Sequence, residues 1–321
     1  MNSKILDILY ASSDYVSGET ISESLGVSRT AVWKHINMLK KERYQILSVS
    51  NKGYKLIKEN LPLNEYEVKR YYDGNMNLIY MNEVESTNTT AKSIASELTK
   101  TTLVMAGIQN KGRGRLGKEF SSDNDKGIWT SFIFKPEMEP AKATIFTLAA
   151  SVAVCKTLKE KCHIDAKIKW PNDIIVNNKK ICGILTEMSS EMDKVNYIVV
   201  GIGINLLQTE FESTIKEVAT SVFLATKQKY ERGLLIGSLC YNMDEIYSDI
   251  QNNELSKIID EWKHFSMTIG REVRVIKAHE EFYGIVKDID DAGRLILEEK
   301  SGKIEVFNAG EVSIRGIMGY A

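Results

Sequence analysis

Residues 109–120 read QNKGRGRLGKEF, and this stretch decides between two kinds of fold. Gly112, Gly114 and Gly117 have the G-x-G-x-x-G spacing of a dinucleotide-binding turn, which lies directly before a helix whose N-terminus holds a pyrophosphate. Residues 118–127, however, are polar and acidic and carry no helical stripe of apolar side chains. No strand–helix–strand unit with a ribose-binding acid follows either, so we exclude a Rossmann fold.

The same loop carries positive charge between its glycines. Glycine lets the backbone approach a ligand closely, and arginine donates paired hydrogen bonds to phosphate or carboxylate. We therefore predict a mobile loop that closes over anionic groups, and we consider a merely solvated loop the weaker interpretation. The cations are Lys111, Arg113, Arg115 and Lys118.

A second group of cations lies in residues 167–184, KIKWPNDIIVNNKKICGI. Alternation predicts a strand over residues 163–170, with Lys169 on the face opposite Trp170. The tight turn at residues 177–180 then brings Lys180 back beside Lys169, and Gly183 inside a strand indicates close approach by a ligand. Asn172 is suited to bind a nucleotide or phosphate.

Asp173 is suited to hold Mg²⁺, which prefers carboxylate and water ligands. The four histidines lie outside both clusters, and neither cluster holds an activated serine or cysteine. Such a site works by positioning its substrates and neutralising their charge. One such reaction is attack of a carboxylate on the α-phosphate of ATP.

Composition indicates an ordinary soluble protein of two or three domains, with 321 residues and a formal net charge of −1. The four cysteines form no C-x-x-C pair, which favours reduced thiols, and the N-terminus carries no signal-peptide core. No apolar run approaches the roughly 20 residues that span a bilayer. We therefore expect a cytoplasmic protein with no membrane contact.

Residues 1–60 are predicted to form a winged helix. Two short helices flank residues 26–27, Ser28 is a natural N-cap, and a hairpin follows around residues 51–53. Residues 27–58 carry a net charge of +7, whereas residues 1–26 carry −3, which favours DNA binding over a solvated basic face. The residues predicted to contact DNA are Ser28, Arg29, Thr30, Trp33, Lys34 and Lys52.

The rest of the chain divides into a mixed domain, residues 65–267, and an all-β domain, residues 268–321. The mixed domain contains an apolar core helix over residues 143–161, and residues 197–206 read as a central strand because they are apolar on both faces. The β domain has five short alternating segments with turns at residues 290–293 and 300–303, typical of a small antiparallel barrel or sandwich. The other strands predicted are residues 101–109, 173–176 and 181–188.

The motifs GRGRLG, KWPND, residues 180–183 and GIGINL resemble those of biotin–protein ligases, in order and spacing. With the winged helix, the resemblance covers the chain and is to the bifunctional form, ligase and biotin-operon repressor. It implies a multidomain α/β protein: a winged helix-turn-helix, a central mixed α+β domain related to class II synthetases and biotinyl/lipoyl ligases, and a C-terminal SH3-like β barrel.

The resemblance also implies chemistry and partners. Biotin and ATP, with Mg²⁺, would give biotinyl-5′-AMP, and a lysine of a biotin carboxyl carrier protein would then take the biotin. The protein would form a homodimer promoted by the adenylate and would bind operator DNA with the adenylate as corepressor. The strand at residues 197–206 or a neighbour would pair across that dimer.

Matched residue by residue, the resemblance implies three groups of site residues. The catalytic residues would be Lys180, Arg113 and Arg115. Biotin would contact Ser86, Thr87, Asn88, Gln109, Gly112, Arg113, Gly114, Arg115, Lys180 and Gly183. ATP would contact Arg115, Lys169, Trp170, Asn172, Asp173, Asn205 and Arg315, and Asp173 would hold Mg²⁺.

The chain departs from the family pattern in this loop. Leu116 stands where many members have a basic residue, Phe120 replaces a usual tryptophan, and residues 121–127 are unusually acidic. A catalytically inactive, ligand-sensing DNA-binding regulator is an alternative, but Lys180, Arg113, Arg115 and Asp173 are all present, which argues against it. A lipoate or octanoyl ligase is a weaker one, because that family lacks the paired motifs.

Overall fold

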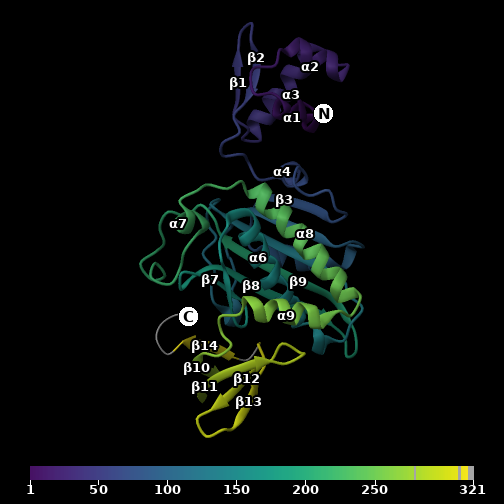
Figure 1. The fold of residues 1–321 in the computed structure, drawn as a ribbon. Coiled ribbons are helices and arrows are strands. Elements are labelled where there is room, and N and C mark those ends of the chain that lie inside the picture. Colours follow the sequence, from purple (N-terminus) through teal and green to yellow (C-terminus); the bar gives the residue numbers. More distant parts are fainter. Residues whose placement is uncertain (278–279, 310–311, 317–321) are drawn as a thin grey trace. The chain divides into compact units, whose positions relative to one another are not determined.

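The computed structural model describes residues 1–277, 280–309 and 312–316, the last segment with side chains only at Val312 and Ile314. The chain divides into two compact units, Met1–Lys69 and Arg70–Ala321 (Figure 1).

The first unit is a winged helix. Its elements are α1 (Asn2–Ala11), α2 (Gly18–Leu25), α3 (Arg29–Lys41) and the hairpin of β1 (Ile46–Val49) and β2 (Gly53–Leu56). The Ser28 hydroxyl caps α3 by accepting from the Ala31 N–H at 3.2 Å, as predicted. Val32, Ile36 and Leu39 are at most 1% exposed and form the inner stripe of α3, so the predicted helix face is confirmed.

A buried carboxylate fixes the short helix α4 (Glu65–Lys69) to this unit. Glu67 is 2% exposed, and its carboxylate accepts from the hydroxyls of Tyr10 and Tyr44, each at 2.8 Å. Burial raises the pKa of Tyr44. The two hydroxyls donate to a carboxylate that burial would otherwise penalise, and so satisfy it.

A seven-stranded sheet forms the centre of the second unit. The strand order is β3-β4-β5-β9-β8-β7-β6, with β3 parallel to β4 and all other pairs antiparallel. The strands are β3 (Asn77–Val84), β4 (Thr102–Gln109), β5 (Gly127–Phe134), β6 (Lys167–Lys169), β7 (Asp173–Val176), β8 (Lys179–Ser190) and β9 (Val195–Asn205).

The strand β9 is the fourth of seven, so its predicted central position is confirmed. The suggestion that this strand pairs across a dimer is wrong, because β5 and β8 already occupy both of its edges. The strand predicted over residues 163–170 shrinks to β6, since α6 continues to Cys162 and His163 caps it with φ 55°. Lys169, which alternation placed on the face opposite Trp170, is buried.

Helices cover both faces of this sheet. The alternating side chains of β5 show the layers: Ile133 packs with Ala91 of α5, whereas Phe134 packs against Phe146 of α6 and Tyr247 of α8. The helices are α5 (Thr87–Ile94), α6 (Ile145–Cys162), α7 (Val222–Thr226), α8 (Arg232–Gln251) and α9 (Leu255–Phe265), with short 3₁₀ turns η1 (Ala95–Glu97), η2 (Arg115–Gly117) and η3 (Pro140–Lys142).

One of these helices corrects the statement that no apolar run approaches the length of a membrane span. The segment Pro140–Cys162 is long and apolar enough to cross a bilayer by length and composition. However, 72% of its apolar window is buried inside the protein. Its apolar character therefore serves the core between the sheet and the outer helices.

The C-terminal part is a five-stranded antiparallel sheet in the order β13-β12-β11-β10-β14, in agreement with the small all-β region predicted. It joins the central domain at Trp170, whose backbone N–H donates to the Thr268 hydroxyl at 2.9 Å and whose indole donates to the Gly293 carbonyl at 3.0 Å. The strands are β10 (Glu272–Lys277), β11 (Glu280–Ile289), β12 (Leu295–Glu299), β13 (Ile304–Phe307) and β14 (Val312–Gly316). The predicted domain boundaries at residues 60 and 268 stay a prediction.

Candidate functional site

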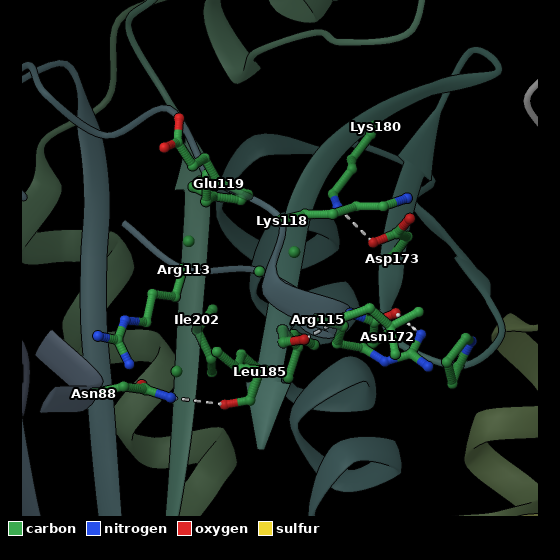
Figure 2. A pocket seen from close by; sticks show the side chains of 18 of the residues that line it. Asn88, Arg113, Arg115, Lys118, Glu119, Asn172, Asp173, Lys180, Leu185 and Ile202 are labelled. Atoms are coloured by element: carbon green, nitrogen blue, oxygen red, sulfur yellow. Dashed lines mark hydrogen bonds and ion pairs between the residues drawn. The ribbon is translucent and has the colours of Figure 1, made fainter. Parts of the chain in front are cut away.

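A cavity of about 240 Å³ brings both predicted cationic clusters together (Figure 2). It opens beside the N-terminus of α5 and is walled by the glycine-rich loop, by β8 and β9, and by the turn before β7. The predicted residues that line it are Ser86, Thr87, Asn88, Gln109, Arg113, Gly114, Arg115, Lys169, Trp170, Asn172, Asp173, Lys180 and Gly183.

Two predicted residues with described side chains, Gly112 and Asn205, do not line this cavity, and a third prediction, Arg315, falls outside the described side chains. Gly112 has a structural reason to lack a side chain, because a Cβ there would lie 2.1 Å from the Ser122 hydroxyl. The Asn205 amide donates to the Thr220 carbonyl at 3.1 Å instead. Arg315 belongs to β14 by its backbone, but its side chain lies outside the described residues.

One end of the cavity is a buried network of neutral polar groups. The Gln109 side-chain oxygen accepts from the Thr87 N–H at 2.7 Å and from its hydroxyl at 2.9 Å. The Ser131 hydroxyl lies within 2.6 Å of the Asn88 side-chain oxygen and 2.7 Å of the Thr87 hydroxyl. Ser86 is the N-cap residue of α5, but its buried hydroxyl accepts no hydrogen bond from the backbone N–H groups of that helix among the described residues. This hydroxyl lines the cavity and is free to bond to a ligand.

This network continues to a charged pair that sequence reasoning missed. Glu187 accepts from the Asn88 amide at 2.8 Å and from Lys92 at 2.5 Å. Burial alone would raise the pKa of Glu187, but the hydrogen bonds from Lys92 and Asn88 together hold it below its ordinary value. Glu187 lies on β8, whereas Lys92 lies on α5, so no local sequence pattern links these two residues.

Glycines on the central strands make room for this geometry. A Cβ on Gly201 would lie 2.2 Å from the Asn88 side-chain oxygen, and a Cβ on Gly203 would lie 2.8 Å from the Phe120 ring. The motif GIGIN therefore keeps the floor of the cavity flat. Phe120 fills the space over Gly203 and packs edge-on against Trp129, with ring centroids 5.8 Å apart.

The glycine-rich loop folds back on itself without starting a helix. The Phe120 N–H donates to the Gly112 carbonyl at 2.9 Å, and the Gly114 N–H donates to the Lys118 carbonyl at 2.7 Å. The loop holds only the three-residue turn η2 before β5 begins. The exclusion of a dinucleotide-binding turn is therefore confirmed.

Arg115 ties this loop to the C-terminal sheet. Its guanidinium donates to the Asn172 side-chain oxygen at 3.1 Å, to the Val312 carbonyl at 3.0 Å and to the Ala309 carbonyl. Burial lowers the pKa of Arg115, although the nearby charge of Asp173 opposes the shift. Leu116, the residue that departs from the family pattern, is 61% exposed and also lines the cavity.

The other end of the cavity is strongly cationic. Lys180 forms an ion pair with Asp173 at 2.6 Å and lies 5.7 Å from the centroid of the Phe120 ring. Its backbone is held by bonds to the carbonyl of Val218 and from the N–H of Thr220. Figure 2 shows the Lys118 and Lys180 side chains converging on Asp173, while Arg113 extends toward Asn88.

The lining chemistry defines what the cavity can do. The described lining residues include no cysteine or histidine, and no cluster of three or more metal-ligating side chains exists among the residues described. A polar, sterically defined end next to a cluster of cations suits a neutral polar ring joined to an anionic group. The cavity is built to orient substrates and to neutralise charge as it develops.

The first unit holds a separate depression of about 720 Å³ between α2, α3 and the β1–β2 hairpin. Arg29, Thr30, Trp33 and Lys52 line it, as a DNA-contacting surface would require. Lys34 is exposed on the same helix, and Ser28 caps it. In the part of the chain that the structure describes, the charged ends of Arg29 and Lys34 make no hydrogen bond or ion pair.

Comparison with known proteins identifies three parts of the chain. Residues 80–205 match the Biotin/lipoate A/B protein ligase family, residues 268–315 match the Biotin protein ligase C terminal domain, and residues 2–55 match an HTH domain. The structure is similar to a biotin protein ligase from Aquifex aeolicus in complex with biotin and ATP, with a TM-score of 0.64 and 26% identity over 75% of this chain and 99% of that chain.

These matches define the class: the chain is a member of the biotin–protein ligases. It is 38% identical to the Bifunctional ligase/repressor BirA of Bacillus subtilis over 93% of this chain and 94% of that protein. It is 28% identical to the protein of the same name from Escherichia coli over 96% and 95%. The chain therefore belongs to the family of bifunctional ligase/repressors.

Proposed function

We propose that this protein activates biotin with ATP and transfers it to a lysine of a biotin carboxyl carrier protein. A biotin carboxylate oxygen bonds to the α-phosphorus of ATP as the bond to pyrophosphate breaks. The ε-amino group of the acceptor lysine then bonds to the acyl carbon of biotinyl-5′-AMP, loses a proton, and AMP leaves. The observation that carries this proposal is the junction of a neutral polar pocket with the Lys180 cluster.

The polar end would receive the ureido ring of biotin. The free hydroxyl of Ser86 supports a direct contact, and the Gln109 amide has one N–H beyond the one that it donates to Ser122 at 3.1 Å. The oxygens of Gln109 and Asn88 already accept bonds within the protein. Gln109, Thr87 and Asn88 would therefore chiefly shape the pocket. This role is narrower than the expected one, in which their side chains would both donate to and accept from the ureido ring.

The cationic end would act on the reacting groups. A fixed ammonium at Lys180 lowers the repulsion between biotin's carboxylate and the α-phosphate and stabilises the charge that develops in the transition state. Arg113 has no hydrogen-bond partner among the described residues, so it is available to the bound anion. Arg115, held by Asn172 and the C-terminal sheet, would close the loop over the adenylate.

The remaining predicted residues would serve ATP. Asp173 and Asn172 present oxygen atoms at this end, and Mg²⁺ prefers such ligands together with phosphate oxygens and water. When bound, the ion would supply charge neutralisation to the phosphates. Lys169 and Trp170 line the same wall, and Asn205 and Arg315 stay candidates for the nucleotide.

We propose further that the winged helix binds operator DNA and that the adenylate is the corepressor, in a cytoplasmic protein. The HTH match, the net charge of residues 27–58 and the uncommitted cations on α3 support DNA binding. A chain lacking residues 1–69 should retain biotinylation and lose operator binding in a mobility-shift assay. Specific DNA binding by that shortened chain would contradict the assignment.

The homodimer would form through the exposed edge of β8. The strand β7 pairs with β8 only as far as Gly183, whereas β9 pairs with it as far as Ser190. Residues 185–190 of β8 therefore lack a strand neighbour on one side among the described residues, and an open edge favours pairing with another chain. In a two-fold pair, residue i of one chain contacts residue j of the other and residue j contacts residue i, so the same edge is used by both chains.

Changing Met188, which is 47% exposed on this edge, to Asp should place an unpaired negative charge of each chain in the pairing edge and weaken the dimer. Met192 is 97% exposed in the turn beyond the strand, so Met192→Asp is the matched control. Sedimentation with biotin and ATP measures the effect. Equal dimer populations for both variants would exclude this edge.

The experiment for the ligase is mass spectrometry of an apo biotin carboxyl carrier domain incubated with this protein, biotin, ATP and Mg²⁺. One biotin should appear on one lysine, with release of pyrophosphate and AMP. Binding of biotin without any mass gain would favour the inactive, ligand-sensing regulator.

A further inference from the structure

The largest exposed aromatic side chain of the winged helix has no structural role within it. The four tryptophans of the chain differ sharply: Trp129, Trp170 and Trp262 are at most 1% exposed, whereas Trp33 is 56% exposed. Trp33 makes no hydrogen bond, ring contact or cation contact within the portion of the chain that is described. Exposure of so much apolar surface is unfavourable, so a ligand that covers it would gain from the contact.

The surroundings of Trp33 identify the chemistry of that ligand. Trp33 lines the depression between α3 and the hairpin together with Val49, which is 40% exposed. Arg29 and Lys52 line the same depression and Glu19 is its one described carboxylate. An apolar surface set among cations fits a polyanion that also presents apolar groups.

DNA presents one such group in its major groove. The 5-methyl group of thymine is apolar and distinguishes A·T from G·C pairs there, whereas phosphate contacts carry no sequence information. If α3 enters the major groove, Arg29 and Lys34 can reach the phosphates, and Trp33, one turn beyond Arg29, faces the base edges. The indole is the apolar side chain best placed to meet such a methyl.

We infer that Trp33 is a specificity-determining residue that reads thymine methyl groups in each half of the operator. This inference rests on the proposed DNA binding and deepens it, because it states which bases the helix selects. Val49 extends the apolar wall, and the cations anchor the backbone on either side. The operator halves should accordingly require thymine at the positions that α3 covers.

The test removes the methyl groups and leaves the rest of the DNA unchanged. A duplex is first selected from a random 30-base-pair pool by the full-length protein with biotin and ATP. Its thymines are then replaced one at a time by deoxyuridine, and affinity is measured by fluorescence anisotropy. Loss of one buried methyl should weaken binding by about fourfold at a contacted position.

Variants assign the loss to Trp33. Trp33→Ala should bind thymine and deoxyuridine duplexes equally, and its salt dependence should match that of the unchanged protein. Met38→Ala is the matched control, because Met38 is 48% exposed on the same helix but does not line the depression, and it should keep the fourfold preference. Arg29→Ala should instead weaken binding to both duplexes and reduce the salt slope by about one.

Two results would overturn the inference: equal binding of thymine and deoxyuridine by the unchanged protein, or a methyl preference that persists in Trp33→Ala. The unchanged protein needs no folding control, since only the DNA differs. Failure to select any duplex would have another meaning, because it would refute DNA binding itself. A protein partner over Trp33 would leave the deoxyuridine result flat and so also refute the inference.

Discussion

Replacing Gly201 by Ala tests how the floor of the cavity positions Asn88. The new Cβ would lie 2.2 Å from the Asn88 side-chain oxygen, and ordinary contact begins at 3.4 Å. Asn88 must therefore move by about 1.2 Å. Its space is limited, because the side chain is 4% exposed and held by hydrogen bonds from Ser131 at 2.6 Å and to Glu187 at 2.8 Å.

The magnitude follows from these bonds. A displacement of this size breaks both the bond from Ser131 and the bond to Glu187, and each buried bond contributes about 1 kcal/mol. A loss of about 2 kcal/mol in the preformed pocket corresponds to about thirtyfold weaker biotin binding. Isothermal titration with biotin alone measures this quantity, and thermal unfolding checks that the variant remains folded.

Gly203→Ala is the matched control, two residues along the same strand and on the same face. Its Cβ would meet the Phe120 ring at 2.8 Å, beside Lys180 and away from Asn88. We expect this variant to alter pyrophosphate release while biotin affinity stays within about threefold of the original. If a folded Gly201→Ala protein binds biotin normally, the position of Asn88 does not govern that pocket and the reasoning fails.

Three further predictions concern charge. Lys180→Ala should slow pyrophosphate release by about 100- to 1000-fold, the cost of one preorganised electrostatic contact, and near-normal release would refute its role. Arg115→Gly removes the tether between the loop and the C-terminal sheet, so the adenylate should escape and label lysines of a bystander protein, and unchanged retention would mean that another residue holds the loop. Lys92→Met removes the partner that lowers the pKa of Glu187. A carboxyl group whose pKa is lower in the folded than in the unfolded state stabilises the protein fully above its unfolded-state pKa, and this stabilisation is lost as the pH falls through its folded-state pKa. The variant should therefore melt below the original protein at pH 7, and this difference should shrink below about pH 4, whereas a constant difference would exclude the pair as its source.

The sequence by itself was informative wherever function depends on local pattern. The capped helix α3, the hairpin after it and the strand β9 follow from residues close together in the chain, since periodicity and turn chemistry are local. The glycine-rich loop could be separated from a dinucleotide-binding turn because the following ten residues lack a helical stripe. The cations of both clusters were also visible, because positive charge at close spacing needs no tertiary structure to be noticed.

Only the tertiary structure decided which of these residues meet and what they are free to do. The buried network of Gln109, Asn88 and Glu187 joins β4, α5 and β8, and the contacts of Arg115 reach a sheet nearly 200 residues later. Alternation placed Lys169 on the face opposite Trp170, but only the structure shows that it is buried in the cavity wall. Periodicity assigns a face to a side chain, but burial and hydrogen-bond partners depend on what the rest of the chain packs against that face.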